Sequence, residues 1–407
     1  MPPKCTNRSR NLWSILLCLR AVDIVSQFNH VHHLYNTSAI RPVIFHGYPT
    51  ESCDYNFGAP RAWKATPRDV SGAVLFGTRF AQHVIWQRQH PFDCSLKRFI
   101  VYFANDNHGI GSTVHCIGQY LSLAMTLGRI LILGDGGLWT SGTFCTGARR
   151  IDECFFEPLS SCSYDDIPSN ISQYDGTHNQ TDQFVRADGM KISDWKAVPQ
   201  EFYKVLRVSG IPKSGWSFWW RCQSSAFIVR PNVRTKQAMD IARSATFNFR
   251  IDPGVIAVYI RRGDKITESP GMITSDEPFL LAAEKMWRSN RLLTNSIYLS
   301  TEDNATVDYF VANSSWKVMH TNVSRFHEQK SPLTHAKQIG PTVEFINSLV
   351  SLDLSLRCDG FVAAMVSNWG RLINELRSTV RCKANHPFSD PEQRHGMQWV
   401  LPFKKSV

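Results

Sequence analysis

Short apolar runs alternate along this chain with segments whose apolar residues recur three and four positions apart. The first pattern predicts buried strands, and the second predicts helices that pack through one face. The alternation is clear in two regions, residues 97–133 and residues 255–380. Because a strand, a helix and a further strand in succession form a parallel pair, we expect an α/β fold with parallel sheets.

The first region holds one strand–helix–strand unit. Residues 99–103 and 130–133 predict its strands, and residues 113–127 predict the helix between them. Gly128 follows that helix, in the position where glycine ends many helices in a left-handed conformation. The segment before this unit, residues 31–95, is rich in histidine, proline and aromatic residues, and we expect it to be irregular.

The second region repeats the alternation four times. Its predicted strands are residues 255–260, 297–301, 316–320 and 361–367, and its predicted helices are residues 278–290, 306–312, 341–357 and 368–380. Such a doubly wound domain binds ligands outside the carboxyl ends of its strands. We therefore expect two Rossmann-like domains facing a cleft, an N-terminal one at residues 31–245 and a C-terminal one at residues 246–385, followed by a tail at residues 386–407.

The start of the chain, residues 1–30, has the make-up of a targeting segment. Basic residues at positions 4, 8 and 10 precede an apolar run at residues 12–19, which is typical of a signal peptide or a signal anchor. Because the run is shorter than the roughly 20 residues of a membrane-spanning helix, a short amphipathic helix is the alternative.

Cysteines and glycosylation sequons favour a secretory compartment. The chain has eleven cysteines, and the absence of any CxxC pair excludes zinc ribbons and thioredoxin-like sites. N-glycosylation sequons begin at Asn7, Asn36, Asn170, Asn179, Asn304, Asn313 and Asn322. Because disulfides and N-glycans form in the secretory route, we expect the Golgi or ER lumen, with the chain either anchored to the membrane or secreted.

Nine of the cysteines lie beyond residue 30, so an otherwise fully bridged monomer keeps at least one free thiol. We expect that thiol to be Cys116, because it lies among apolar residues of a predicted helix, where cysteine behaves as a small hydrophobe. The expected bridges involve Cys145, Cys154 and Cys162, which would staple one loop region, and join Cys358 to Cys382. The intervening helix could hold that last pair more than about 7 Å apart, which is too far for a bridge.

The charge of the chain is +11, from 45 basic and 34 acidic residues. An excess of this sign suits an anionic partner such as a nucleotide phosphate. Because no arginine-rich tract or zinc-finger spacing accompanies it, we expect no nucleic-acid partner.

The strongest candidate for chemistry follows the strand at residues 255–260. Arg261 and Arg262 can clamp a diphosphate, because each guanidinium offers paired donors to phosphate oxygens. Asp264 would orient this cluster, and Lys265 adds a third cation. A solvated charged turn is the alternative.

Two predicted helix starts are further candidates. Ser367 and Asn368 lie where a strand passes into a helix, and free backbone N–H groups at such a start bind anions. Simple helix capping by the same residues is the alternative. Gly109 and Gly111 would let a ligand approach the backbone, and His115 lies on one face of the next helix. The sequence alone leaves a structural role for that loop equally open.

Carboxylates supply the remaining candidates. Glu302 and Asp303 end a strand and could hold sugar hydroxyls, although a solvated loop explains them as well. Asp353 interrupts an apolar helix, and a buried carboxylate needs a partner such as a guanine edge, whereas an exposed position needs none. The histidines at positions 30, 32 and 33 lack a fourth ligand, so we expect no metal site.

Taken in order along the chain, these pieces resemble the α1,6-fucosyltransferases, a family that includes rhizobial chitin-oligosaccharide fucosyltransferases and the enzymes of N-glycan core fucosylation. The resemblance covers about residues 97–383 with scattered identity. The matching segments are residues 109–133, 155–162, 218–221, 228–231, 261–265, 298–303 and 352–353, followed by Ser367 and Asn368.

The resemblance implies a GT-B-like fold and an inverting, metal-independent transfer of fucose from GDP-fucose to a glycan or glycoprotein acceptor. It places Arg261 and Arg262 at the diphosphate, with a contribution from Ser367, and Asp353 at the guanine. It also places Lys265, Glu268, Glu302 and Asp303 near the donor sugar and the acceptor.

The chain departs from the family pattern at three positions. Tyr259 stands where the family has His, and Asn368 stands where it has Gln. Glu268 lies one residue closer to Lys265 than the acidic residue of the family does. Alternatives with the same donor are a xyloglucan-type enzyme and a protein O-fucosyltransferase-like enzyme. A catalytically silent carbohydrate-binding relative is an alternative from another class.

Overall fold

The computed structural model describes residues 43–45, 48–53, 72–104, 108–162, 168, 170–175, 180–187, 198–269, 271–312, 315–325 and 331–392. By its contacts the chain separates into residues 1–43 and residues 44–407, and the description below concerns the second unit. The predicted targeting segment, residues 1–30, lies outside the described residues.

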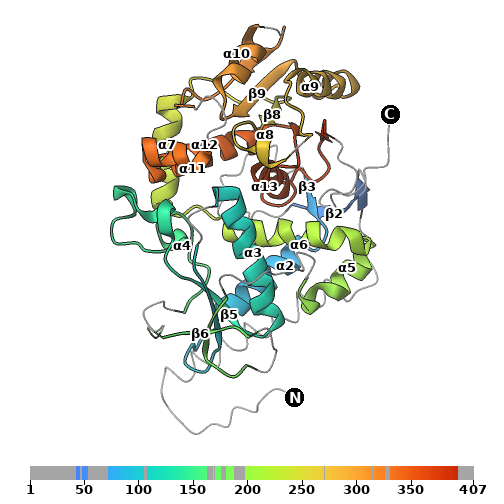
Figure 1. Cartoon of the computed structure of the whole chain (residues 1–407). Coiled ribbons are helices and arrows are strands. Elements are labelled where there is room, and N and C mark those ends of the chain that lie inside the picture. Colours follow the sequence, from blue (N-terminus) through green and yellow to red (C-terminus); the bar gives the residue numbers. More distant parts are fainter. Residues whose placement is uncertain are drawn as a thin grey trace, which may run out of the picture. The chain divides into compact units, whose positions relative to one another are not determined.

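An N-terminal parallel sheet has the strand order β5-β4-β7-β6, and Figure 1 labels its two outer strands, β5 and β6. Its strands are β4 (Phe99–Tyr102), β5 (Ile130–Leu133), β6 (Ser172–Gln173) and β7 (Phe184–Arg186). Helix α3 (Ile110–Thr126) connects β4 to β5 and starts three residues earlier than the predicted 113–127. Gly128 ends it with a φ of +63°, which confirms the predicted role of that glycine.

A C-terminal parallel sheet has the order β10-β9-β8-β11-β12. Its strands are β8 (Ile256–Ile260), β9 (Ser296–Thr301), β10 (Lys317–Met319), β11 (Gly360–Ala363) and β12 (Phe388–Ser389). The helices of this half are α8 (Lys265–Glu268), α9 (Glu277–Ser289), α10 (Asn304–Ala312), α11 (Pro332–Ile339), α12 (Pro341–Arg357) and α13 (Asn368–Arg377). The expected α/β fold with two parallel sheets is confirmed, whereas the boundary at residues 245/246 stays a prediction.

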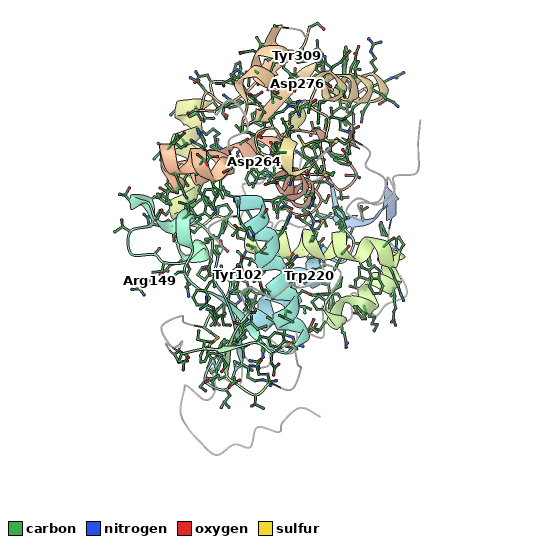
Figure 2. All side chains as sticks on the ribbon, viewed as in Figure 1. Tyr102, Arg149, Trp220, Asp264, Asp276 and Tyr309 are labelled. Atoms are coloured by element: carbon green, nitrogen blue, oxygen red, sulfur yellow. A yellow bond between two sulfur atoms is a disulfide. The ribbon has the colours of Figure 1, made fainter. Side chains whose placement is uncertain are left out.

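Alternation along β8 explains how the C-terminal sheet is covered. Ile256, Val258 and Ile260 point into a hydrophobic core that also holds Phe279 of α9 and Phe310 of α10. Figure 2 places Asp264, Asp276 and Tyr309 in this half, and Tyr102 and Trp220 in the half that contains α3. Because side chains alternate along a strand and the even-numbered positions of β8 point into this core, its odd-numbered positions face the opposite side of the sheet.

Two predicted elements end early. The last strand was predicted to reach residue 367, but β11 ends at Ala363 and residues 364–367 turn into the next helix. The Ser367 backbone N–H donates to the Ala364 carbonyl, which closes this turn. Helix α13 then ends at Arg377 rather than at residue 380.

The expectation of an irregular segment at residues 31–95 is wrong for part of it. Strands β1 (Val43–Phe45), β2 (Tyr48–Ser52) and β3 (Ala73–Leu75) form a small sheet in that order. Helix α2 (Thr78–Gln89) follows. Periodicity misses α2 because two of its buried residues are glutamines; Gln89 donates to the Leu131 and Leu159 carbonyls.

The region at residues 135–250, in which no regular pattern stood out, contains the helices that join the two halves. They are α4 (Ile151–Cys154), α5 (Tyr203–Ser209), α6 (Lys213–Ile228) and α7 (Val233–Thr246), with the short 3-10 helices η3 (Gly137–Thr140), η4 (Thr143–Cys145) and η5 (Gln200–Phe202). Helix α6 packs against both α3 and α13, and α7 packs against α12. Because α6 is buried nearly all round, its sequence shows no amphipathic period.

Three disulfides lie among the described residues. They join Cys53 to Cys382, Cys94 to Cys162, and Cys145 to Cys154. Cys116, Cys222 and Cys358 are free. The prediction for Cys116 and a bridge within the 145–162 region are confirmed, but Cys162 pairs with Cys94.

The predicted Cys358–Cys382 bridge is wrong. Helix α13 lies between these residues in sequence, and the Cys358 thiol is buried and donates to the Leu354 carbonyl. The backbone carbonyl of Cys382 accepts from the Ala73 amide, which brings that cysteine beside β3 and its partner Cys53. None of the helices in the described segments is long and apolar enough to cross a membrane.

Candidate active-site cavity

A cavity of about 420 Å³ lies between elements of the two halves. The N-terminal half contributes the start of α3 and Trp139 of η3. The C-terminal half contributes the carboxyl ends of β8 and β9, helix α8, the segment at residues 321–325, α11, one face of α12 and the start of α13. Nine predicted site residues line it, namely Gly109, Gly111, Tyr259, Arg261, Asp264, Lys265, Glu268, Ser367 and Asn368, as does Glu302.

The two walls of this cavity meet at Gly111. A Cβ added there would lie 3.0 Å from the Asn368 carbonyl carbon and 3.0 Å from the Trp369 amide nitrogen. Any other residue there would push the first turns of α3 and α13 apart by a few tenths of an ångström, so glycine suits this close approach. Two helix starts then face one cavity, and both present free backbone N–H groups.

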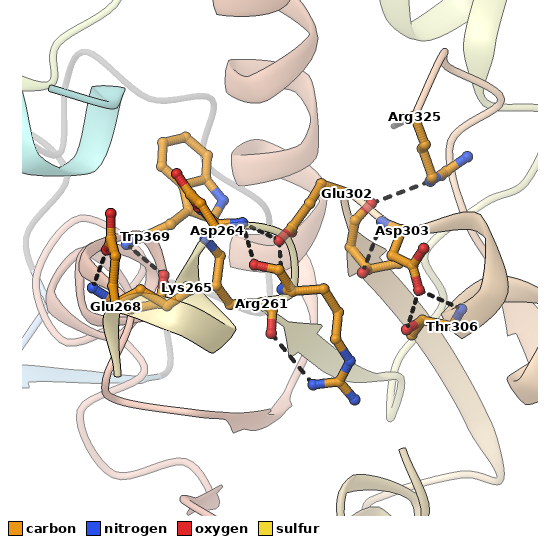
Figure 3. Close-up of polar contacts among 12 residues, drawn as sticks. Arg261, Asp264, Lys265, Glu268, Glu302, Asp303, Thr306, Arg325 and Trp369 are labelled. Atoms are coloured by element: carbon orange, nitrogen blue, oxygen red, sulfur yellow. Dashed lines mark hydrogen bonds and ion pairs between the residues drawn. The ribbon is translucent and has the colours of Figure 1, made fainter. Parts of the chain in front are cut away.

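Arg261 is the cation at the centre of the C-terminal wall (Figure 3). Its guanidinium forms ion pairs with Glu302 and Asp264. Burial alone would lower the pKa of Arg261, but Glu302 in particular raises it above its ordinary value. The side chain stays charged and is held in a fixed position at the carboxyl end of β8.

Arg262 lies on the other side of the strand, outside the cavity lining. It is 6% exposed, and its guanidinium pairs with Asp276 and donates to the Ile273 and Ser275 carbonyls. It also lies over the Phe279 ring of α9. The structure therefore does not bring both predicted phosphate clamps into one site.

The start of α13 carries a second polar group. The Ser367 hydroxyl caps the helix by accepting from the Trp369 backbone N–H. Tyr259 places its hydroxyl 3.0 Å from the same Ser367 oxygen. Burial raises the pKa of Tyr259, so this phenol keeps its proton and can donate.

His115 lies behind the cavity rather than on its wall. Its ring contacts Asn368 through Nδ1 and Glu375 through Nε2, both at 3.0 Å. Glu375 also pairs with Arg221 of α6, and these ion-pair side chains are buried. Burial lowers the pKa of His115, although the Glu375 charge opposes this. The network ties α3, α6 and α13 together and orients Asn368, whose amide also donates to Ser112 at 2.5 Å.

The remaining predicted residues fall into two groups. Lys265 and Glu268 pair with each other at 2.9 Å on the cavity wall. Asp303 is absent from the lining and caps α10, because it accepts from the Thr306 backbone N–H. The predicted catalytic role of Asp303 is untested, but its position is that of a helix cap.

Asp353 also lies outside the cavity lining. It is 5% exposed and pairs with Arg243, Arg357 and Arg381. Burial would raise the pKa of Asp353, but Arg381 and Arg357 hold it below its ordinary value. The partner that a buried carboxylate requires is thus supplied by arginines of the chain itself.

A row of polar residues on α12 lines the cavity but was not among the predicted site residues. Glu344, Asn347, Ser348 and Ser351 line the cavity at positions that fall on one face of the helix. Ser351 joins this row to β9, because its hydroxyl lies 2.8 Å from the Ser300 hydroxyl. Their spacing in an otherwise apolar helix was the signal available in the sequence.

This arrangement suits an anionic ligand that leaves with its electron pair. Two helix starts and Arg261 can stabilise negative charge, and carboxylates of the same wall can accept a proton from an attacking hydroxyl. Over the part of the chain that the structure describes, no group of three or more His, Cys, Asp or Glu side chains is arranged to hold a metal ion.

Solved structures to which this chain is similar include several fucosyltransferases. NodZ α1,6-fucosyltransferase, co-crystallised with GDP, is 15% identical over 69% of this chain and 92% of its own, with a TM-score of 0.38. A FUT1 mutant from Arabidopsis thaliana in complex with GDP is 12% identical over 74% of this chain and 73% of its own, with a TM-score of 0.38. POFUT1 in complex with GDP-fucose is 13% identical over 72% of this chain and 97% of its own, with a TM-score of 0.39.

No curated protein sequence shows a significant match. The family model of the alpha-(1,6)-fucosyltransferase N- and catalytic domains, however, matches residues 77–322, more than half of the 407 residues. This match confirms the resemblance drawn from the sequence motifs, and it covers Gly109, Arg261 and Glu302 of the cavity wall. The chain belongs to the alpha-(1,6)-fucosyltransferase family of glycosyltransferases.

Proposed function

We propose that this protein transfers fucose from GDP-fucose to a hydroxyl of a glycan or glycoprotein acceptor, with inversion and without a metal ion. The observation that carries the proposal is the single cavity shared by Arg261, the start of α3 and the start of α13, in a chain of this family. Diphosphate is the ligand chemistry that such groups recognise.

In this mechanism Arg261 and the two helix starts stabilise the charge that develops on GDP as the bond to fucose breaks. Ser367 contributes a hydroxyl at the start of α13, and Tyr259 holds that hydroxyl in place. Glu268 and Glu302 are the two wall carboxylates that the family resemblance places near the acceptor, and either could accept the acceptor proton. Both are paired with a cation, Glu268 with Lys265 and Glu302 with Arg261, but Glu268 is the more exposed and therefore the better placed to meet the acceptor.

The direct experiment is to incubate the purified chain with GDP-fucose and a glycan array, and to measure both transferred fucose and released GDP. Transfer should require Arg261 and should persist in excess EDTA. Activity lost in EDTA and restored by manganese would contradict the metal-independent mechanism. The array would also identify the acceptor and the linkage, and would separate α1,6-type transfer from xyloglucan-type or protein O-fucosylation.

Two features favour a silent carbohydrate-binding relative as the second candidate. Tyr259 replaces the histidine of the family pattern, and the Arg261 guanidinium is already paired with two carboxylates. GDP binding separates the candidates, because a protein that only binds carbohydrate has no reason to retain a nucleotide site. Glycan binding without GDP binding would support the silent relative.

We further propose a lumenal site of action, in the Golgi or ER. The three disulfides support it, as do the exposed sequon residues Asn170 and Asn322. Mass mapping of non-reduced peptides from the protein made in a secretory host tests this directly. Finding all cysteines reduced and no glycan at either position would contradict the placement.

A further inference from the structure

One carboxylate of the cavity wall differs from the others. Four carboxylates line the cavity, and three of them have a cation: Asp264 and Glu302 pair with Arg261, and Glu268 pairs with Lys265. Glu344 has no ion-pair partner anywhere in the described residues. Its one hydrogen bond is with the Ser348 hydroxyl, which donates to Oε1 at 3.2 Å.

Such a carboxyl is left with unused capacity to accept hydrogen bonds. A carboxylate has about four acceptor positions, and the bond from Ser348 fills one of them. Burial raises the pKa of Glu344 to about 7, and the Glu302 charge raises it further. The protein thus keeps on the cavity wall a carboxyl whose remaining acceptor positions no described side chain fills.

The position of Glu344 on α12 suits an elongated polar ligand. Seven residues separate Glu344 from Ser351 on one helix face, which corresponds to about 10 Å along the helix axis. Asn347 and Ser348 fill the interval, and Ser351 meets Ser300 at the carboxyl end of β9. A polar row of this length matches a nucleoside or a disaccharide rather than a single small ion.

We propose that Glu344 is a specificity-determining residue of this cavity, accepting hydrogen bonds from two neighbouring donors on the bound ligand. This inference rests on the proposed function, which identifies the ligand as GDP-fucose. Two parts of that molecule carry such a donor pair. They are the N–H groups of the guanine edge and the hydroxyls of the fucose.

The test is calorimetric titration of wild type, Glu344→Gln and a control, Glu284→Gln, with three probes: GDP, IDP and GDP-fucose. Glutamine keeps the size of the side chain and its bond to Ser348, but replaces an acceptor oxygen by an N–H donor. Glu284 pairs with Arg288 on α9 and does not line the cavity. Thermal melts of the three proteins establish that all are folded.

Guanine recognition predicts that Glu344→Gln binds GDP at least about tenfold more weakly than wild type, as expected for a lost bond to a charged acceptor. Wild type would also prefer GDP over IDP, which lacks the 2-amino group, and the variant would lose this preference. Fucose recognition predicts unchanged GDP and IDP binding but a loss of about tenfold for GDP-fucose. Either result supports the assignment and identifies the source of the donors.

Equal binding of all three probes by the variant and the control would overturn the role of Glu344 while leaving the proposed function intact. If none of the three proteins bound GDP or GDP-fucose, the proposed function itself would be wrong, and this inference with it. Wild type and the control variant therefore distinguish two outcomes: Glu344 has no role in binding, or the protein does not bind GDP or GDP-fucose.

Discussion

The two halves of the molecule contribute to the cavity in different ways. The N-terminal half supplies residues 108–112 and Trp139, whereas Arg261, Lys265, Arg325 and all four lining carboxylates come from the C-terminal half. One wall shapes the cavity and the other carries its ionic charge. Substitutions in the C-terminal half should therefore alter the charge of the cavity, and substitutions in the N-terminal half should alter its shape.

The largest effect on stability is expected at Arg262. Arg262→Ala leaves Asp276 without its partner, and breaking a buried pair of this kind costs about 3–5 kcal/mol in the free energy of unfolding. Denaturant unfolding measures the loss. Arg288→Ala, which removes an exposed helical pair, serves as control and should cost about 0.5 kcal/mol or less. Similar midpoints for the two variants would contradict the structural role of Arg262.

Arg261→Ala should lower the catalytic activity. Removing a preorganised charge that stabilises the leaving group typically lowers turnover by about 10²–10³-fold. The measurement is kcat/KM for transfer from GDP-fucose, together with the affinity for GDP. The adjacent arginines thus make a matched pair, one affecting stability and the other affecting activity. Unchanged GDP affinity and turnover would remove Arg261 from the site.

Loss of the Cys94–Cys162 bridge should weaken the N-terminal half selectively. The Cys94–Cys162 bridge packs against Phe99 and Ile130 at the edge of the N-terminal sheet, whereas no bridge in the described residues lies within the C-terminal sheet. Replacing both cysteines by serine should cost about 2–4 kcal/mol. Hydrogen exchange should show the loss first in β4 and β5, and a loss spread evenly over both sheets would contradict this view.

Gly111→Ala tests the contact between the walls. Its added Cβ would meet backbone atoms of Asn368 and Trp369 at 3.0 Å, so the helix starts must move apart, at a cost of about 1–3 kcal/mol. Gly109→Ala is the matched control, because nothing lies within 4 Å of a Cβ there. Equal thermal stability and equal activity of the two variants would show that the walls do not meet as described.

The smallest effect concerns pH. The pKa of Glu344 is raised from 4.5 to about 7, so the folded protein binds more protons than the unfolded chain between these values. Stability contributed by the protonated carboxyl is therefore lost as pH rises through this window. Glu344→Gln should become more stable relative to wild type from pH 5 to pH 7, by on the order of 1 kcal/mol. A constant difference across that range would contradict the shift.

Much of the fold could be predicted from the sequence because strands buried on both faces appear as continuous apolar runs. The helices α12 and α9 agree with the predicted ranges, 341–357 and 278–290, to within a residue at each end. They were predicted because apolar residues recur along them at helical spacing. Helices α2 and α6 were missed, because one buries glutamines and the other is buried on nearly every face.

The candidate site was predicted less completely. The alternation of β8 continues past its end, so Arg262 follows Ile260 toward the core and Arg261 follows Tyr259 toward the cavity. The same alternation places the two arginines on opposite sides of the strand, so only one of them lines the cavity. The burial of Asp353 could not be predicted, because its partners Arg243 and Arg381 come from distant parts of the chain.

The proposed nucleotide site requires one ligand to contact both walls of the cavity, and hydrogen–deuterium exchange with and without GDP tests this most directly. Peptides covering residues 109–112 and 367–369 should both gain protection on GDP binding, because both helix starts would donate to the diphosphate. In Arg261→Ala both gains should shrink together. Protection of one wall alone, or of neither at saturating GDP, would contradict a nucleotide site shared by the two halves.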